Sequence, residues 1–221
     1  MWYPIKSPFW LRWIYPHLTW HRSRKHRCLY LTFDDGPIPD VTPQILNILK
    51  SYGIKATFFC VGDNIQKHPE IFERIKTEGH QIGNHTYHHL KGWDTSKLAY
   101  LENVERCHQL TQSRLFRPPY ARGTRAQYSE LIKNYEIMMW DVMSGDFDPK
   151  MSPAQCLNNV INHAENGSII VFHDNIKALP RVIYALPRAI EHWLKDGYEF
   201  KTLEIVHNKI DTMGRIRRKG T

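Results

Sequence analysis

The sequence predicts an α/β protein built on a parallel sheet, because short apolar runs alternate with amphipathic helical patterns along 221 residues. This alternation disfavours a β-sandwich and a helix bundle. The length suits one domain with a sizeable core, and 42 % hydrophobic with 24 % charged residues excludes a disordered chain. Reactive side chains repeatedly follow the apolar runs, as expected where the carboxyl ends of parallel strands meet at one edge.

The first predicted strand, Cys28–Phe33, is an apolar run that ends in two acids, a glycine and a proline. The helix that follows begins at Thr42, which can cap it, and ends near Gly53. The last helix contains Pro187, which predicts a kink or a break there. Further strands are predicted at 56–61, 81–83, 115–117, 136–140 and 168–172, and further helices at 69–78, 96–112 and 152–164.

Composition divides the chain into an aromatic and basic arm at 1–27, a main domain at 28–207 and a basic tail at 208–221. The net charge of +8 suits peripheral contact with a membrane surface or an anionic cell-wall polymer, although basic runs are more often simply solvated. No recognisable binding module accompanies this charge, so we expect no nucleic-acid partner. The four cysteines lie far apart, which indicates neither a thiolate zinc site nor a disulfide framework.

The arm is rich in Trp, Tyr, Phe and Ile, but Pro4, Pro8 and Pro16 interrupt it. It therefore matches neither a signal peptide nor a membrane-spanning helix. We expect a cytoplasmic or peripheral membrane protein. Packing of the arm over the domain is the preferred reading, and contact with a membrane surface is the alternative. The tryptophans of the main domain, Trp93, Trp140 and Trp193, are expected in the core.

A metal site is predicted from His85, His89 and Asp35. Two imidazoles four residues apart lie on one side of a helical turn, and a carboxylate after another strand completes a three-ligand set. Such a set leaves room for water and suits one divalent metal, zinc above all, with cobalt or nickel as alternatives. A chain with 13 His can also produce this spacing by chance, and Asp-Asp-Gly-Pro can be a plain turn.

The acids and bases around this predicted site suggest a division of roles. If Asp35 binds the metal, Asp34 beside it is placed to take a proton from water as a general base. His173, at the end of another strand, can supply a proton to a leaving amine. Arg117 and Asp146 are natural ion partners for Asp34 and His173.

These residues resemble the polysaccharide deacetylase family with its NodB-homology domain, whose five motifs appear in order between Leu29 and Leu203. The resemblance implies an irregular (β/α)7 barrel. The first motif resembles Thr32-Phe33-Asp34-Asp35-Gly36, which implies Asp34 as base and Asp35 as ligand. The second resembles His85-Thr86-Tyr87-His88-His89, which implies His85 and His89 as ligands.

The third motif resembles Arg117-Pro118-Pro119-Tyr120, which implies that Arg117 orients the base and that the Tyr120 N–H stabilises the oxyanion. In the fourth, Asp146 keeps the position that tunes the catalytic histidine. Met143 and Phe147 replace the usual Asp and Trp, which puts the substrate groove in question. The fifth resembles Val171-Phe172-His173, with His173 as general acid and Val171 lining the acyl pocket. The residues expected to bind substrate are Pro119, Tyr120, Phe147 and Val171.

The resemblance implies a metal-dependent hydrolase that removes an N-acetyl group from an amino sugar in a polysaccharide or oligosaccharide, such as peptidoglycan or chitin. The expected partner is therefore an N-acylated carbohydrate, and the oligomeric state stays open. Three alternatives remain. One is a deformylase or deacetylase of a lipid-linked or small intracellular amino sugar, which the arm and the lack of a signal-peptide pattern favour over a secreted enzyme. The others are an O-acetyl esterase and an inactive carbohydrate-binding homologue.

Overall fold

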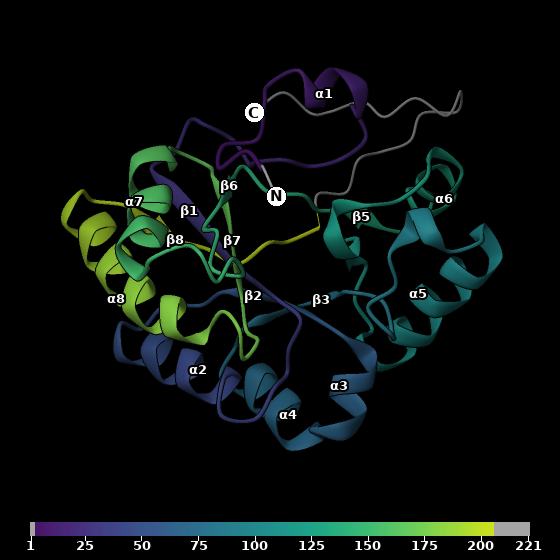
Figure 1. The fold of residues 1–221 in the computed structure, drawn as a ribbon, viewed down its shortest axis with the longest axis horizontal. Coiled ribbons are helices and arrows are strands. Elements are labelled where there is room, and N and C mark those ends of the chain that lie inside the picture. The colour runs from purple at the N-terminus through teal and green to yellow at the C-terminus, as the bar shows by residue number, and fades with distance from the viewer. Residues whose placement is uncertain (1–2, 206–221) are drawn as a thin grey trace.

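The computed structural model describes residues 3–205 and shows a curled parallel sheet with helices on its outer face (Figure 1). Its strand order is β5-β4-β3-β2-β1-β7-β6, and β8 pairs with β1. All these pairings are parallel. The predicted α/β class and the (β/α)7 architecture are therefore confirmed, as an open half-barrel. The strands are β1 Cys28–Asp34, β2 Thr57–Cys60, β3 Gln81–Asn84, β4 Leu115–Phe116, β5 Glu136–Ile137, β6 Val142–Met143, β7 Ile169–His173 and β8 Glu199–Phe200.

The helices form two groups around the outer face of the curled sheet (Figure 1). Helices α2, α4, α7 and α8 bury apolar faces against the main core cluster. Helices α5 and α6 pack with Tyr100, Val104 and Tyr128 in a second cluster, under β4 and β5. The bounds are α2 Thr42–Ser51, α3 Gly62–Lys67, α4 Pro69–Thr77, α5 Lys97–Thr111, α6 Arg125–Leu131, α7 Pro153–His163 and α8 Leu179–Lys195.

The alternation of side chains along β1 explains why Asp34 lies on the inner face of the curled sheet. Leu29, Leu31 and Phe33 belong to the main core cluster, which lies against the helices. Because successive residues of a strand point to opposite faces, Thr32 and Asp34 point the other way. On that inner side both side chains accept hydrogen bonds from the guanidinium of Arg117.

The arm lies across the open edge of the half-barrel, between β5 and β6. Lys6 pairs with Val142 in the antiparallel sense, and Thr19 pairs with Met138 in the parallel sense. Leu18 and Trp20 are buried there. Backbone groups at the ends of a sheet need partners, and the arm supplies them at both edge strands. The expected basic tail, 208–221, lies outside the described residues.

Five short helices and strands were not predicted from the sequence: α1 (Leu11–Ile14), α3, α6, β6 and β8. Of the two outcomes predicted at Pro187, a kink or a break, the break is wrong, because α8 runs unbroken from Leu179 to Lys195. Buried residues on both sides of the proline, including Leu186 and Ile190, hold the helix together through packing that offsets the lost backbone hydrogen bond. Within residues 3–205, no helix is long and apolar enough to cross a membrane.

Trp93 is 57 % exposed, so its expected core position is also wrong. It lies in the 3-10 helix Gly92–Asp94, where its indole N–H donates to the Gly123 carbonyl over 3.1 Å. The guanidinium of Arg122 covers the ring at 4.6 Å from its centroid. Local contacts to the 122–123 loop, and not burial in the core, therefore hold this side chain. Trp193 is buried as expected.

Candidate active site

Asp35, His85 and His89 converge, with one ligand atom from each lying within 4.8 Å of the others. Asp35 Oδ1 lies 3.1 Å from His89 Nε2 and 3.7 Å from His85 Nε2. Asp35 directly follows β1, and His85 directly follows β3. The two histidines do not lie on a helical turn, as their spacing predicted, because Thr86 and His89 have positive φ angles of 63° and 55°. An irregular loop brings the imidazoles together, with ring centroids 5.0 Å apart.

Neighbouring groups fix the orientation of these three side chains. His85 Nδ1 lies 2.7 Å from the Arg117 carbonyl oxygen, which makes Nδ1 the protonated nitrogen and leaves the Nε2 lone pair facing Asp35. Asn175 Nδ2 donates to Asp35 Oδ2 over 2.6 Å, and Asn64 Nδ2 donates to the Asp35 carbonyl over 2.7 Å. Sequence reasoning missed both asparagines, although Asn175 directly follows the His173-Asp174 pair at the end of β7.

The protonation of the cluster suits a cation. Burial lowers the pKa of His85 to about 4, so the ring is neutral at physiological pH. Burial alone would raise the pKa of Asp35, but its hydrogen bond with His89 and the nearby positive charge of His173 hold that pKa below its usual range. One carboxylate and two imidazoles, at least one of them neutral, form a donor set that fits a divalent metal such as zinc.

Asp34 forms an ion pair with Arg117 inside the sheet. Arg117 Nη1 donates to Asp34 Oδ1 over 2.7 Å and to Thr32 Oγ1 over 2.8 Å. The same guanidinium donates to the carbonyl oxygens of Met138 and Met139, and it lies 4.1 Å from the Phe59 ring centroid. A fully buried guanidinium with all these partners holds Asp34 in one orientation.

His173 pairs with Asp146 at the neighbouring strand end. His173 Nδ1 lies 2.7 Å from Asp146 Oδ1, and the His173 backbone N–H donates to Asp146 Oδ2 over 2.6 Å. Burial opposes protonation of the ring, but the Asp146 carboxylate raises the pKa of His173 to about 10. The imidazole therefore carries a proton at neutral pH. The register of β1 and β7 sets Asp34 beside His173.

A buried carboxyl braces the loop that carries Asp35. Asp174 accepts hydrogen bonds from the Gly36 N–H over 2.8 Å and from the Thr42 hydroxyl over 2.7 Å. Burial raises the pKa of Asp174 to about 8. A Cβ at position 36 would lie 1.8 Å from Asp174 Oδ2, so only glycine allows this approach.

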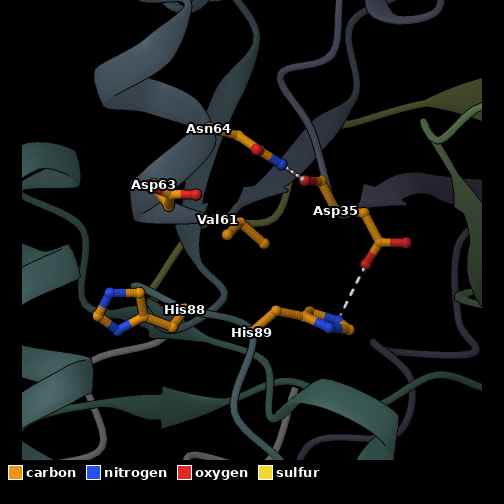
Figure 2. Close-up of a pocket in the computed structure, with 6 residues that line it drawn as sticks. All are labelled: Asp35, Val61, Asp63, Asn64, His88 and His89. Atoms are coloured by element: carbon orange, nitrogen blue, oxygen red, sulfur yellow. Dashed lines mark hydrogen bonds and ion pairs between the residues drawn. The ribbon is translucent and has the colours of Figure 1, made fainter.

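A pocket of about 300 Å³ opens beside the candidate metal ligands (Figure 2). Figure 2 shows Asp35 and His89 facing each other at one end, with Asn64 reaching the backbone of Asp35. None of the four predicted substrate-binding residues lines this pocket. The lining residues are Asp35, Val61, Asp63, Asn64, His88 and His89.

The predicted substrate-binding residues lie in different surroundings. Tyr120 is 60 % exposed, and its ring centroid lies 4.7 Å from that of His89. Pro119 is buried just before it. Val171 is fully buried in β7, where it pairs with Thr32 and Met143. These positions bring Tyr120 to the ligand cluster and leave Val171 within the sheet.

Phe147 connects the arm to the candidate general acid. Its ring lies 5.4 Å from the His173 ring, edge to face, and 4.9 Å from the ring of Tyr3. The Tyr3 hydroxyl donates to Asp148 Oδ2 over 3.1 Å. Sequence reasoning missed Tyr3, and no motif could have revealed it, because the contact spans more than 140 residues of chain.

Backbone strain also concentrates at the site. Among the described non-glycine residues, seven have positive φ angles, and five of these are Asp35, Thr86, His89, Tyr120 and Ala121. Two of the three candidate metal ligands are in this group. Such conformations cost about 1–3 kcal/mol each and persist where surrounding contacts hold them, as they often do at functional sites.

Comparison with known proteins assigns the family. Residues 21–140 match the model of the family described as polysaccharide deacetylase. A peptidoglycan-N-acetylglucosamine deacetylase of Bacillus cereus is 32 % identical over 200 residues, covering 85 % of this chain and 91 % of the relative. A peptidoglycan-N-acetylmuramic acid deacetylase of Bacillus subtilis is 32 % identical over 202 residues, covering 82 % of this chain and 72 % of the relative. Among solved structures, a peptidoglycan N-acetylglucosamine deacetylase in complex with a naphthyl N-oxidanyl-benzamide is similar, with a TM-score of 0.83 and 31 % identity. The match covers 89 % of this chain and 95 % of that one. This chain therefore belongs to the polysaccharide deacetylase family of hydrolases.

Proposed function

We propose that this protein is a metal-dependent N-deacetylase that acts on an N-acetylated amino sugar of peptidoglycan. The observation that carries the proposal is the convergence of Asp35, His85 and His89 next to two ion pairs, Asp34 with Arg117 and His173 with Asp146. This arrangement combines a cation site, a carboxylate base and a protonated imidazole. Metal-assisted hydrolysis of an amide uses these three functions together.

The candidate ligands would hold one divalent metal, with zinc as the first choice and cobalt or nickel as alternatives. When bound, such a metal polarises an amide carbonyl and makes water more acidic. Asn175 and the Arg117 carbonyl would keep Asp35 and His85 in the orientation that ligation requires.

The chain's own acid and base complete the reaction. Asp34, held by Arg117, takes a proton from the water whose oxygen attacks the acetyl carbonyl carbon. The backbone N–H of Tyr120 would stabilise the charge that develops on the carbonyl oxygen. His173, protonated because of Asp146, donates its proton to the nitrogen as the C–N bond breaks. The products are acetate and a free amine.

The relatives support peptidoglycan as the substrate class. One is named for N-acetylglucosamine and the other for N-acetylmuramic acid, so both sugars are candidates. The intact base, acid and ligand set disfavours an inactive carbohydrate-binding homologue.

Release of acetate from N-acetylated peptidoglycan fragments tests the proposal. Protein treated with a chelator and dialysed should be inactive, and addition of one equivalent of Zn²⁺ should restore acetate release. Parallel assays with an N-formylated amino sugar and with O-acetylated xylan test the deformylase and esterase alternatives. Acetate release that a chelator does not change would contradict the metal dependence. Release from O-acetylated xylan alone would contradict the N-deacetylase assignment.

A further inference from the structure

Four large apolar side chains of the arm lie exposed within six residues. Phe9 is 64 % exposed, Trp10 47 %, Trp13 77 % and Ile14 49 %. We call these four residues the aromatic patch. Trp13 and Ile14 belong to the short helix α1, Leu11–Ile14, and Phe9 and Trp10 directly precede it. This helix has no buried residue and lies apart from α2, α4, α7 and α8 in Figure 1. An exposed apolar patch of this kind is often an interaction site.

The exposure does not come from a loose chain, because both ends of the segment are fixed to the sheet. Before the patch, the Ser7 N–H donates to the Asp141 carbonyl over 2.8 Å, and the Ser7 hydroxyl donates to the Trp140 carbonyl over 2.6 Å. After it, the Thr19 N–H donates to the Ile137 carbonyl over 2.9 Å, between the buried Leu18 and Trp20.

A buried carboxylate fixes which face of the segment points inward. Asp141 is fully buried and forms ion pairs with Lys6 at 2.8 Å and Arg24 at 2.9 Å. Arg12, from α1 itself, lies 3.7 Å from its other oxygen. Because this cation of α1 faces Asp141, the neighbouring Trp13 and Ile14 are held toward solvent. The Phe9 and Trp13 rings contact each other edge to face, with centroids 5.4 Å apart.

The charge of the arm favours an anionic partner. Residues 1–27 contain six Lys or Arg and no Asp or Glu. Part of this charge is neutralised by the domain, but Lys25 and Arg27 remain exposed. Tryptophan together with basic residues is the composition that settles at the boundary between lipid headgroups and acyl chains.

The size of the patch favours lipid over a second protein. Side chains of this size expose roughly 500 Å² together. A standard protein interface needs about 800 Å² on each partner. A bilayer has no such requirement, since a few side chains that enter the headgroup region are enough for reversible binding.

We propose that the aromatic patch inserts into the interfacial region of an anionic phospholipid bilayer and holds the enzyme at a membrane surface. The ion pairs at Asp141 then fix the orientation of the catalytic domain relative to that surface. The aromatic patch belongs to the arm and contains none of the candidate ligands Asp35, His85 and His89. Membrane binding through it therefore does not depend on the proposed reaction.

Flotation with lipid vesicles tests this proposal. The parent chain should float with vesicles of 70 % phosphatidylcholine and 30 % phosphatidylglycerol, and more weakly with pure phosphatidylcholine. The double variant Trp10→Ser/Trp13→Ser should lose roughly 100-fold in partition coefficient, since each large apolar side chain contributes about tenfold or more. The single variant Trp13→Ser should lie between the two.

The control removes exposed apolar side chains elsewhere. Leu98→Ser/Leu194→Ser changes residues that are 69 % and 44 % exposed, and it should bind vesicles like the parent. Acetate release from a soluble oligosaccharide, measured in parallel, should be equal in the parent and the Trp10→Ser/Trp13→Ser variant. That assay separates a failure of membrane binding from a failure of the proposed reaction.

Three results would overturn the proposal. The first is a parent chain that stays at the bottom of the gradient with anionic vesicles, and the second is a double variant that floats as well as the parent. The third is a parent chain that forms dimers in sedimentation and binds no vesicles, with dimers absent in the double variant. That third result would assign the aromatic patch to a second copy of the chain.

Discussion

The guanidinium of Arg117 lies 2.7 Å from the carboxylate of Asp34, and neither residue is more than 3 % exposed. Arg117 also donates to the carbonyl oxygens of Met138 and Met139, which follow β5. It therefore joins the central strand β1 to the chain beyond the sheet edge. Arg117 therefore both connects these parts of the fold and orients the candidate base, Asp34.

Removal of this guanidinium should destabilise the fold. In Arg117→Met the charge of Asp34 loses its buried partner, and we expect a loss of about 3–5 kcal/mol in the free energy of unfolding. Urea denaturation followed by circular dichroism measures this loss. The control Arg114→Met removes an exposed arginine of the same segment and should change stability by less than about 0.5 kcal/mol. Equal stability of the two variants would contradict the structural role.

The alkaline limit of activity should follow the charge of Asp146. Because the pKa of His173 is raised to about 10, the ring keeps its proton through neutral pH and loses it as pH rises through that value. Asp146→Asn removes the charge that raises this pKa, so the alkaline limb of the kcat/KM profile should move about one pH unit or more toward lower pH. Asp148→Asn, in the same loop, should leave the limb in place. An unchanged limb in Asp146→Asn would contradict the assignment of His173 as general acid.

Alanine at position 36 should disturb the metal site through Asp174. The added methyl would meet the Asp174 carboxylate, so the loop that carries Asp35 must shift. We expect metal affinity to fall about 10- to 100-fold, as for other changes to groups that orient ligands. Titration with Zn²⁺ against a competing chelator measures this affinity. Gly53→Ala is the control: at a φ of 66° the alanine is strained, but its methyl meets open space, so the variant matches the cost of replacing a glycine without touching the loop of Asp35. Equal affinity in both variants would show that Asp174 does not brace the site.

The contact between Tyr3 and Phe147 should affect substrate binding more than chemistry. Tyr3→Ala removes the ring that supports Phe147 beside His173, and we expect KM for an oligosaccharide to rise about 10-fold with metal content unchanged. Tyr3→Phe keeps the ring and should retain the parent KM. Steady-state kinetics of the parent, Tyr3→Ala and Tyr3→Phe give the three KM values. An unchanged KM in Tyr3→Ala would exclude the arm from the substrate groove.

The fold was predictable wherever a segment was long and strongly patterned. The central strands and the longer helices match their predicted positions closely, since alternation and helical periodicity are strong over such lengths. Strand β6 has only two residues, and it is defined by its partners Ile170 and Val171, which no local pattern reveals. Trp93 was misplaced because its cover, Arg122 and Gly123, comes from a loop some 30 residues away.

The site was predictable where chemistry lies at strand ends, and less so where loops shape it. The convergence of Asp35, His85 and His89 was expected, but the helical geometry assumed for the histidine pair was wrong. Local contacts, such as the hydrogen bond from the Leu90 N–H to the Thr86 hydroxyl, hold an irregular loop instead. The supporting contacts of Asn175 and Tyr3 depend on tertiary structure alone.

Metal content and turnover, measured together on Asp34→Asn and His85→Ala, test the central claim most directly. We expect Asp34→Asn to bind one equivalent of metal and to lose acetate release by about 100-fold or more, since it keeps the ligands and lacks the base. His85→Ala should lose both the metal and the activity. An Asp34→Asn protein with parental turnover would contradict the account, and so would a His85→Ala protein that keeps its metal and its activity.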